Sequence, residues 1–308
     1  MVPSRLNMRD SVKHMLHRVW KQRISYLFLL PYALVFLVFT VFPVVLSLWN
    51  SFTYNNLFEP ARFVGFDNYV RMFTRDTAFV QAIKNTLVIA LVTGPAGYLL
   101  SLLLAWLING MVRPLRTIFV LIFYAPTMSS AIYAIWGILF SSDEYGYMNG
   151  FLMSLNFIRE PISWLLDEKY ILAVVVICVL WTSMGVGFLS FVAGLRNIDR
   201  QYYEAASVDG IRNRWQELWF ITLPMMKPQL MFGAIMSITS SFSVHEVTMV
   251  LAGFPSTNNA ALTVVNHLYD YGYLRFELGY ASAIATVLFL AMMGANKLVN
   301  KLLRRVGT

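Results

Sequence analysis

The sequence predicts an all-α membrane protein with six transmembrane helices. Hydrophobic residues make up 58% of its 308 residues and charged residues only 13%, about half the charged share of a soluble globular protein. Six apolar stretches are each long enough, at roughly 20 residues, to cross a bilayer. The basic residues gather in alternate segments between these stretches, as they do in membrane proteins of fixed orientation.

The six predicted spans follow one another along the whole chain. They are residues 24–49, 82–108, 117–140, 170–195, 229–252 and 279–303. Several contain helix breakers, among them Pro31, Pro43, Pro95, Pro126 and Gly185. Membranes tolerate such residues where neighbouring helices or polar side chains satisfy the freed backbone groups. We therefore expect a packed bundle of bent helices.

The placement of Lys and Arg predicts the orientation. With the N-terminus inside, 17 of the 24 basic residues lie in segments on the cytoplasmic side. This positive-inside bias places both termini in the cytoplasm of a bacterial-type plasma membrane. It also accounts for the formal charge of +8, so the charge gives no reason to expect a nucleic-acid partner.

The segment before the first span, residues 1–23, mixes basic residues with Val12, Met15, Leu16, Val19 and Trp20. Those spacings suit an amphipathic helix on the inner membrane face, and a basic tail that only fixes topology is the alternative. The first span has no small-residue cleavage pattern after it, so we interpret it as an uncleaved anchor. Residues 24–303 form the membrane domain and residues 304–308 a short cytoplasmic tail.

The cytoplasmic loop between the fourth and fifth spans, residues 196–228, is unusually long. Residues 201–208 suit a two-turn helix with Asp199 as its cap, and Gly210 then supplies a left-handed or strained backbone. A second helix from about Arg212 carries Trp215, Leu218, Trp219 and Thr222 on one face, which suits the lipid headgroup layer. The small Ala205 and Ala206 would let the first helix enter a cleft on a partner, where Glu204 offers a charge. The alternative is an interfacial helix-turn-helix without a partner.

The spacing of residues in this loop resembles the EAA signature of permease subunits of binding-protein-dependent ABC importers, in the maltose-type branch that serves carbohydrates. The matching residues recur at fixed offsets over the 21 positions from Glu204 to Pro224, with Tyr203 directly before them: Glu204, Ala205, Ala206, Asp209, Gly210, Leu223 and Pro224. Weaker matches agree in order along the chain at residues 63–69, 85–87, 146–149, 164–165 and 278–283.

The resemblance implies that residues 204–210 form the coupling helix, which lies in a cleft of a separate ATPase. It implies a complex with a second permease chain, two ATPase subunits and an extracytoplasmic solute-binding protein. The cargo would be a sugar or oligosaccharide, moved inward by alternating access. ATP and Mg would bind the ATPase, so we expect no cofactor, metal or catalytic residue in this chain.

The fifth span ends in an unusual polar cluster that contains Ser243, His245 and Glu246. An ionisable residue in a span normally faces a bundle interior, a cavity or the interface. At 1.5 Å per residue, a continuous helix would place Glu246 roughly 27 Å beyond Pro228, near the outer surface. The cluster is therefore either the lining at the outer mouth of a translocation path or an interfacial Glu–His pair in contact with water. Relatives usually have Phe-Asp here, so His245 departs from the pattern.

Other function classes lack their signatures. The chain has no phosphate-binding Gly-x-x-x-x-Gly-Lys motif, no His-Glu-x-x-His motif and no Gly-x-Ser-x-Gly motif. A stand-alone secondary transporter would show two matching halves or ion-binding acids at mid-membrane, and only Glu246 comes close. Within the importer class, the alternative cargo is a polyol, glycerophosphodiester or peptide. Cys178 is the single cysteine, so no internal disulfide can form.

Overall fold

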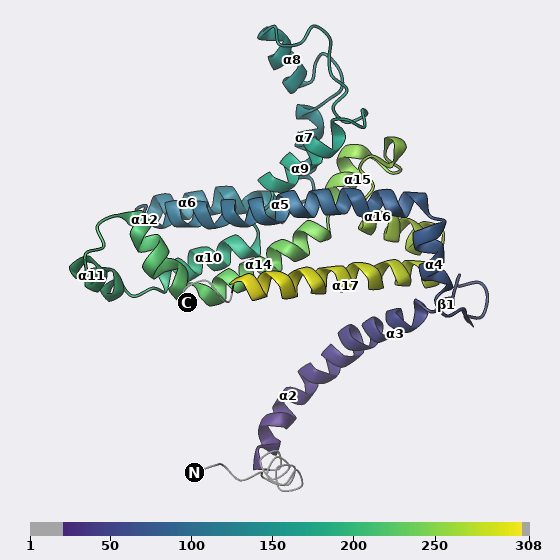
Figure 1. Ribbon diagram of the computed structural model, residues 1–308, viewed down its shortest axis with the longest axis horizontal. Helices are drawn as coiled ribbons and strands as arrows, with labels where there is room; N and C mark the ends of the chain where they lie inside the picture. Colours follow the sequence, from purple (N-terminus) through teal and green to yellow (C-terminus); the bar gives the residue numbers. More distant parts are fainter. Residues whose placement is uncertain (1–20, 304–308) are drawn as a thin grey trace.

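The computed structural model describes residues 21–303. Helices form most of this part of the chain, and one short hairpin is its only sheet. The helices α5, α6, α10, α14 and α17 lie along the long axis of the molecule (Figure 1). In Figure 1, α11 and α12 lie at one end of this bundle, and α4, β1 and α16 at the other. The predicted leader, except for residues 21–23, and the predicted tail fall outside the described residues.

Five of the six predicted spans are helical in the structure, and their ends lie within a few residues of the predicted ends. The first is α2 (Arg23–Phe36), η1 (Leu37–Val41) and α3 (Phe42–Asn50), and the second is α5 (Thr77–Asn109). The fourth is α9 (Ile171–Trp181) with α10 (Val186–Arg196), and the fifth is α14 (Lys227–Phe242) with α15 (Glu246–Ala252). The last is α17 (Leu278–Leu303).

The third predicted span is not one helix. It is split into α6 (Arg113–Tyr124), the short η2 (Ala125–Met128) and α7 (Ile132–Leu139), and the two arms are bent by 87°. Pro126 has no N–H to donate, and Ser129 has an extended backbone (φ −150°, ψ 130°). The Thr127 hydroxyl donates to the Tyr124 carbonyl over 2.8 Å, which satisfies one backbone group that the break leaves free.

The first span departs from the expected packed bundle. None of the residues of α2, η1 or α3 is buried. In Figure 1, α3 lies near the bundle and α2 points away from it. Only α3 packs against α17. The sequence of the span is apolar on all sides, so its exposed faces suit lipid or another chain.

The end of the bundle opposite α11 is built from short elements. β1 (Thr53–Tyr54) pairs antiparallel with β2 (Arg62–Phe63), and α4 (Asp67–Thr74) follows. The other short elements are η4 (Thr257–Asn259), α16 (Val264–Tyr269) and η5 (Asp270–Leu274). α8 (Tyr147–Ser154) lies apart from this end, beyond α7 (Figure 1).

Three buried asparagines hold these elements in place. Asn68 donates to the carbonyls of Ser51 and Thr53, both over 2.9 Å. Asn85, on α5, donates to two carbonyls of the loop after α15, and Asn149 accepts from the Trp164 indole N–H over 2.7 Å. The side-chain amides of these asparagines are hydrogen-bonded to backbone groups. The asparagines therefore fix the loops and do not offer hydrogen bonds to a solute.

Asp76, which caps α5, joins three elements in a buried cluster. Its carboxylate accepts from the Phe79 N–H at 2.9 Å, from the Tyr280 hydroxyl at 2.7 Å, and lies 2.8 Å from His267 Nε2. The Asp76 side chain is 9% exposed. Burial opposes ionisation, yet the hydrogen bonds from His267, Tyr280 and Phe79 hold the pKa of Asp76 below its usual range. The ionised carboxylate therefore stabilises the junction of α5, α16 and α17.

We expect Asp76→Asn to lower the free energy of unfolding by about 1–3 kcal/mol, because it leaves buried donors without an anionic acceptor. A depressed folded pKa contributes stability that is present above the ordinary value of about 3.9 and is lost as pH falls through the lowered pKa. The difference in the free energy of unfolding between wild type and Asp76→Asn should therefore persist at neutral pH and shrink only in acid. Thermal unfolding in detergent from about pH 2 to pH 8 measures it, since the window of loss lies below the ordinary pKa of about 3.9. Asp67→Asn, at an exposed residue, is the control, and an equal loss in both variants would contradict this account.

Candidate functional site

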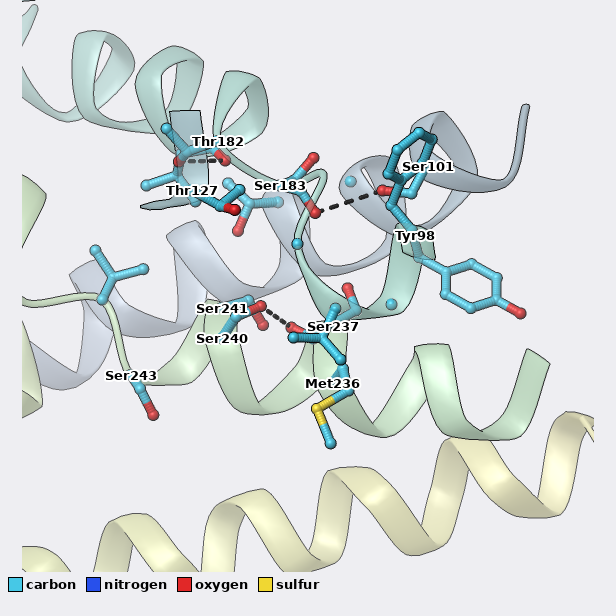
Figure 2. Close-up of a pocket in the computed structure, with 18 of the residues that line it drawn as sticks. Tyr98, Ser101, Thr127, Thr182, Ser183, Met236, Ser237, Ser240, Ser241 and Ser243 are labelled. Carbon is cyan, nitrogen blue, oxygen red and sulfur yellow. Dashed lines mark hydrogen bonds between the residues drawn. The ribbon is translucent and has the colours of Figure 1, made fainter. Parts of the chain in front are cut away.

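A cavity of about 550 Å³ lies inside the bundle. Its walls come from α5, from the breaks between α9 and α10 and between α14 and α15, and from residues near the α6–α7 bend. Figure 2 shows hydroxyl groups of α5, α14 and the α9–α10 break around it. The lining hydroxyls belong to Thr93, Tyr98, Ser101, Thr127, Tyr133, Thr182, Ser183, Ser237, Ser240, Ser241 and Ser243.

The cavity coincides with the places where three spans are interrupted. Helix breaks leave backbone carbonyls unpaired, which is tolerated at membrane depth only where protein or water satisfies them. Here Ser183 donates to the Leu180 carbonyl over 2.7 Å, and Thr182 donates to the Cys178 carbonyl over 3.1 Å, both at the end of α9. The hydroxyls therefore hold the breaks as well as line the cavity.

The fifth span is interrupted where the sequence analysis expected a continuous helix. α14 ends at Phe242 and α15 begins at Glu246, so the straight helix from which the depth of Glu246 was calculated is not present. Ser243, His245 and Glu246 all lie on the cavity wall. The Glu246 carboxylate is in the first turn of α15, where the helix dipole favours a negative charge.

His245 and Glu246 do not form the pair with each other that was one alternative. His245 Nδ1 lies 2.8 Å from Asn266 Oδ1, and since an amide oxygen only accepts, this nitrogen carries the proton. Asn266 Nδ2 donates to the Thr248 hydroxyl over 2.8 Å, and the Thr263 hydroxyl donates to the Val244 carbonyl over 2.8 Å. This network fixes the imidazole at the break.

The cavity offers hydrogen bonds and one carboxylate. Glu246 is the only acidic residue in its lining, and neither Lys nor Arg belongs to it. Phe188, Phe191 and several glycines complete the wall. Such a mixture of hydroxyls and apolar surface suits an uncharged polyhydroxylated solute. In residues 21–303 no group of three or more His, Cys, Asp or Glu side chains has the arrangement of a metal site.

A second candidate region, α11 (Arg200–Val208), lies at the end of the bundle. Asp199 caps it by accepting from the Gln201 N–H over 3.0 Å, as its sequence predicts. Ala205 and Glu204 are exposed, whereas Ala206 is buried. The Glu204 carboxylate lies 3.2 Å from Arg200 on the same exposed face. α11 therefore presents an exposed surface that carries one ion pair beside the small side chain of Ala205.

The end of α11 matches the expected glycine break. Gly210 has φ +96°, and the Ile211 N–H donates to the Ala206 carbonyl over 3.0 Å. This closes the helix in a Schellman-type turn, which requires a left-handed residue where glycine stands. Asp209, the preceding residue, is exposed.

The other matched residues join α11 to the fifth span. The Tyr203 hydroxyl lies 3.0 Å from the Thr222 hydroxyl, which donates to the Glu217 carbonyl over 3.2 Å. Leu223 and Pro224 begin α13 (Leu223–Met225), directly before α14. The match to a signature over 21 positions thus corresponds to a hydrogen-bonded unit of two segments.

The second helix of the loop begins two residues later than expected and includes a π-helical turn. It comprises α12 (Arg214–Glu217), capped by Asn213, and the π-helical turn η3 (Leu218–Thr222). Trp215 and Trp219 are 64% and 68% exposed, but Thr222 is 2% exposed. Thr222 therefore does not belong to the predicted membrane-facing stripe, because its hydroxyl is committed to Tyr203.

Sequence reasoning missed most of the cavity. Its walls depend on which faces of α5, α10 and α14 meet, and hydroxyl residues in spans also satisfy backbone carbonyls locally. The Thr182–Ser183 pair beside Gly185 was the available signal of a break. The sequence gives no signal that Thr263 and Asn266 bind groups at the break in the fifth span. They lie 18 or more residues beyond the residues that they bind, Val244 and Thr248.

Comparisons with known proteins agree over most of the chain. The sequence model of one family, described as the binding-protein-dependent transport system inner membrane component, matches residues 97–306. The chain is 33% identical over 275 residues to the arabinooligosaccharides transport system permease protein AraP of Bacillus subtilis, which covers 89% of this chain and 86% of that one. It is 31% identical to the lactose transport system permease protein LacF of Rhizobium radiobacter, over 86% of this chain and 89% of that one.

A solved structure has the same fold. It is a bacterial ABC transporter involved in the import of the acidic polysaccharide alginate, and its matching chain has a TM-score of 0.76 at 24% identity. The alignment covers 96% of this chain and 100% of that chain. At this level of identity the likeness concerns the fold alone.

Proposed function

Because the chain belongs to the family of binding-protein-dependent transport system inner membrane components, we propose that this permease subunit conducts a sugar or oligosaccharide through its cavity. The hydroxyl-rich lining at the three interrupted spans carries this proposal. Sugar hydroxyls both donate and accept hydrogen bonds, as the Ser and Thr side chains of the lining do. Two relatives named for arabinooligosaccharides and lactose support the same cargo class.

The chain is the transport component, and the energy comes from ATP bound with Mg by a separate ATPase pair. α11 is the segment that docks on this ATPase, through the surface of Glu204, Ala205 and Asp209. The Tyr203–Thr222 hydrogen bond joins α11 to η3, and α13 continues directly into α14. A movement of α11 would thus reach Ser237 and Ser240 on the cavity wall without a flexible linker between them.

The end of the bundle that holds α11 faces the cytoplasm in this proposal, with both termini on the same side. The positive-inside bias supports this orientation. The loops at the opposite end receive a solute-binding protein, and a second permease chain completes the path. Closure of the ATPase pair turns the two permeases outward-open, and hydrolysis returns them to the inward-open state. A polyol, glycerophosphodiester or peptide is the alternative cargo.

We expect Glu246→Gln to raise the sugar concentration for half-maximal uptake about tenfold, because a hydrogen bond to a charged group contributes about 1.5–3 kcal/mol. His245→Phe should act in the same direction. The assay is uptake of labelled arabinooligosaccharide, lactose and glycerol into proteoliposomes that hold this chain with its partner permease, ATPase and binding protein.

Glu160→Gln is the matched control, since Glu160 is exposed and outside the cavity lining. Unchanged uptake in both cavity variants would place the path elsewhere. Uptake of glycerol without either sugar would overturn the cargo class but leave the importer assignment intact.

A further inference from the structure

Three segments meet in a corner at the α11 end of the bundle: the end of α5, the start of α6 and α12. The rings of Trp106 and Trp215 are 5.0 Å apart. The Arg214 guanidinium lies against Gly110, where a Cβ atom would meet its Nη2 at 2.6 Å. Arg116 Nη1 donates to Asn109 Oδ1 over 3.4 Å. Two guanidinium groups thus lie beside consecutive residues at one helix end.

The corner has an excess of positive charge. Arg113 and Arg214 are exposed and Arg116 is half-buried. None of the three belongs to the ion pairs found between residues 21 and 303. The end of α5 offers them partial negative charge from its last carbonyls. With Glu217 as the one carboxylate of α12, the three arginines leave the corner with a net positive charge.

Large apolar side chains surround this charge. Trp215, Trp219 and Phe220 are each more than 60% exposed, and so is Val112 in the turn between α5 and α6. Both α5 and α6 are apolar helices that end or begin here, so the corner lies at the depth where the spans meet water. Trp at that depth is typical of the headgroup layer.

We propose that this corner binds the phosphate of an anionic phospholipid, with Arg116 and Arg214 as its ligands and Trp106, Trp215 and Trp219 beside the upper acyl chains. Guanidinium groups match phosphate oxygens in geometry and charge. Basic pockets between membrane helices at a bilayer surface are a recognised kind of anionic-lipid site. The site is separate from the cavity and from α11, and it does not depend on the proposed cargo.

The test uses the purified full-length chain in nanodiscs of phosphatidylglycerol and phosphatidylcholine at one fixed composition. Two samples are compared, and in each only one of the two lipids carries bromine on its acyl chains. The bromine quenches the fluorescence of tryptophans in contact with that lipid. We expect stronger quenching with brominated phosphatidylglycerol. R116Q/R214Q should abolish this preference, and native mass spectrometry should show phosphatidylglycerol binding weakened by about tenfold or more.

K297Q/K301Q is the matched control, because it also removes two positive charges, both exposed and near the C-terminal end of α17. This variant should keep the preference for phosphatidylglycerol. Arg113→Gln, at an exposed residue, is the milder variant and should reduce the preference in part. Equal quenching by both lipids in wild type would overturn the proposal. So would a preference that survives in R116Q/R214Q, or one that K297Q/K301Q abolishes as well.

Discussion

Glu204→Lys is expected to reduce ATP-driven uptake at least tenfold while the chain stays folded in the membrane. The Glu204 side chain is 65% exposed and its partner Arg200 is 89% exposed, so losing this pair costs only about 0.3–0.5 kcal/mol of stability. In a docked complex, by contrast, the reversed charge would face the group that the carboxylate recognises, and such like-charge contacts cost several kcal/mol. Uptake and ATP hydrolysis in proteoliposomes measure the effect.

Glu59→Lys provides a matched control for this prediction. Glu59 also forms an exposed pair with an arginine, Arg62, over 2.6 Å, but at the opposite end of the bundle. The control should have the same thermal midpoint in detergent as Glu204→Lys, because both variants lose one exposed ion pair. If Glu204→Lys transported as well as wild type, the Glu204 carboxylate would have no part in docking.

Gly233→Leu is expected to have the largest effect on folding. Gly233 lies in α14 where it crosses α10, and a Cβ atom there would collide with the ring of Phe191. Phe191 is 1% exposed and packs edge-on against Tyr98 with ring centroids 5.3 Å apart, so its ring would have to leave this contact and move into the cavity. Adding atoms to a packed interior costs about 1–3 kcal/mol, and more when neighbours cannot shift. Thermal unfolding in detergent should show a lower midpoint.

Gly294→Leu separates this effect from a general cost of leucine in a span. Gly294 is on α17, and a Cβ atom there meets nothing within 4 Å. This variant should unfold as wild type does. Phe191→Ala combined with Gly233→Leu should recover part of the loss. Equal midpoints for the two glycine variants would show that α10 and α14 do not pack as described.

Much of the fold follows from hydropathy, because length and apolar character are local properties of the sequence. The bounds of α17 differ from the prediction by one residue at its start, and Asp199 and Gly210 have the roles that their chemistry predicts. The interruption before Glu246 was not predicted, because no Pro or Gly marks it. It depends on Thr263 and Asn266, which bind the freed backbone and His245 from the far side of a loop.

The two candidate sites also differ in how much of each could be predicted from the sequence. The α11 region could be located from the sequence, since its signature residues lie within 21 positions. The hydrogen bond from Tyr203 to Thr222 was missed because periodicity placed Thr222 on the membrane-facing stripe. The cavity is assembled from α5, α10 and α14, whose contacts no local pattern encodes.

Cross-linking tests the docking of α11 most directly. Cys178 is the single cysteine of the chain and is fully buried, so Ala205→Cys adds one exposed thiol to α11. Tyr145→Cys, at a residue 86% exposed in the loop between α7 and α8, is the comparison. In the assembled importer treated with a thiol-reactive cross-linker, the account predicts an adduct of the ATPase subunit with the residue 205 thiol and none with the residue 145 thiol. An ATPase adduct from residue 145 alone, or from neither residue, would contradict it.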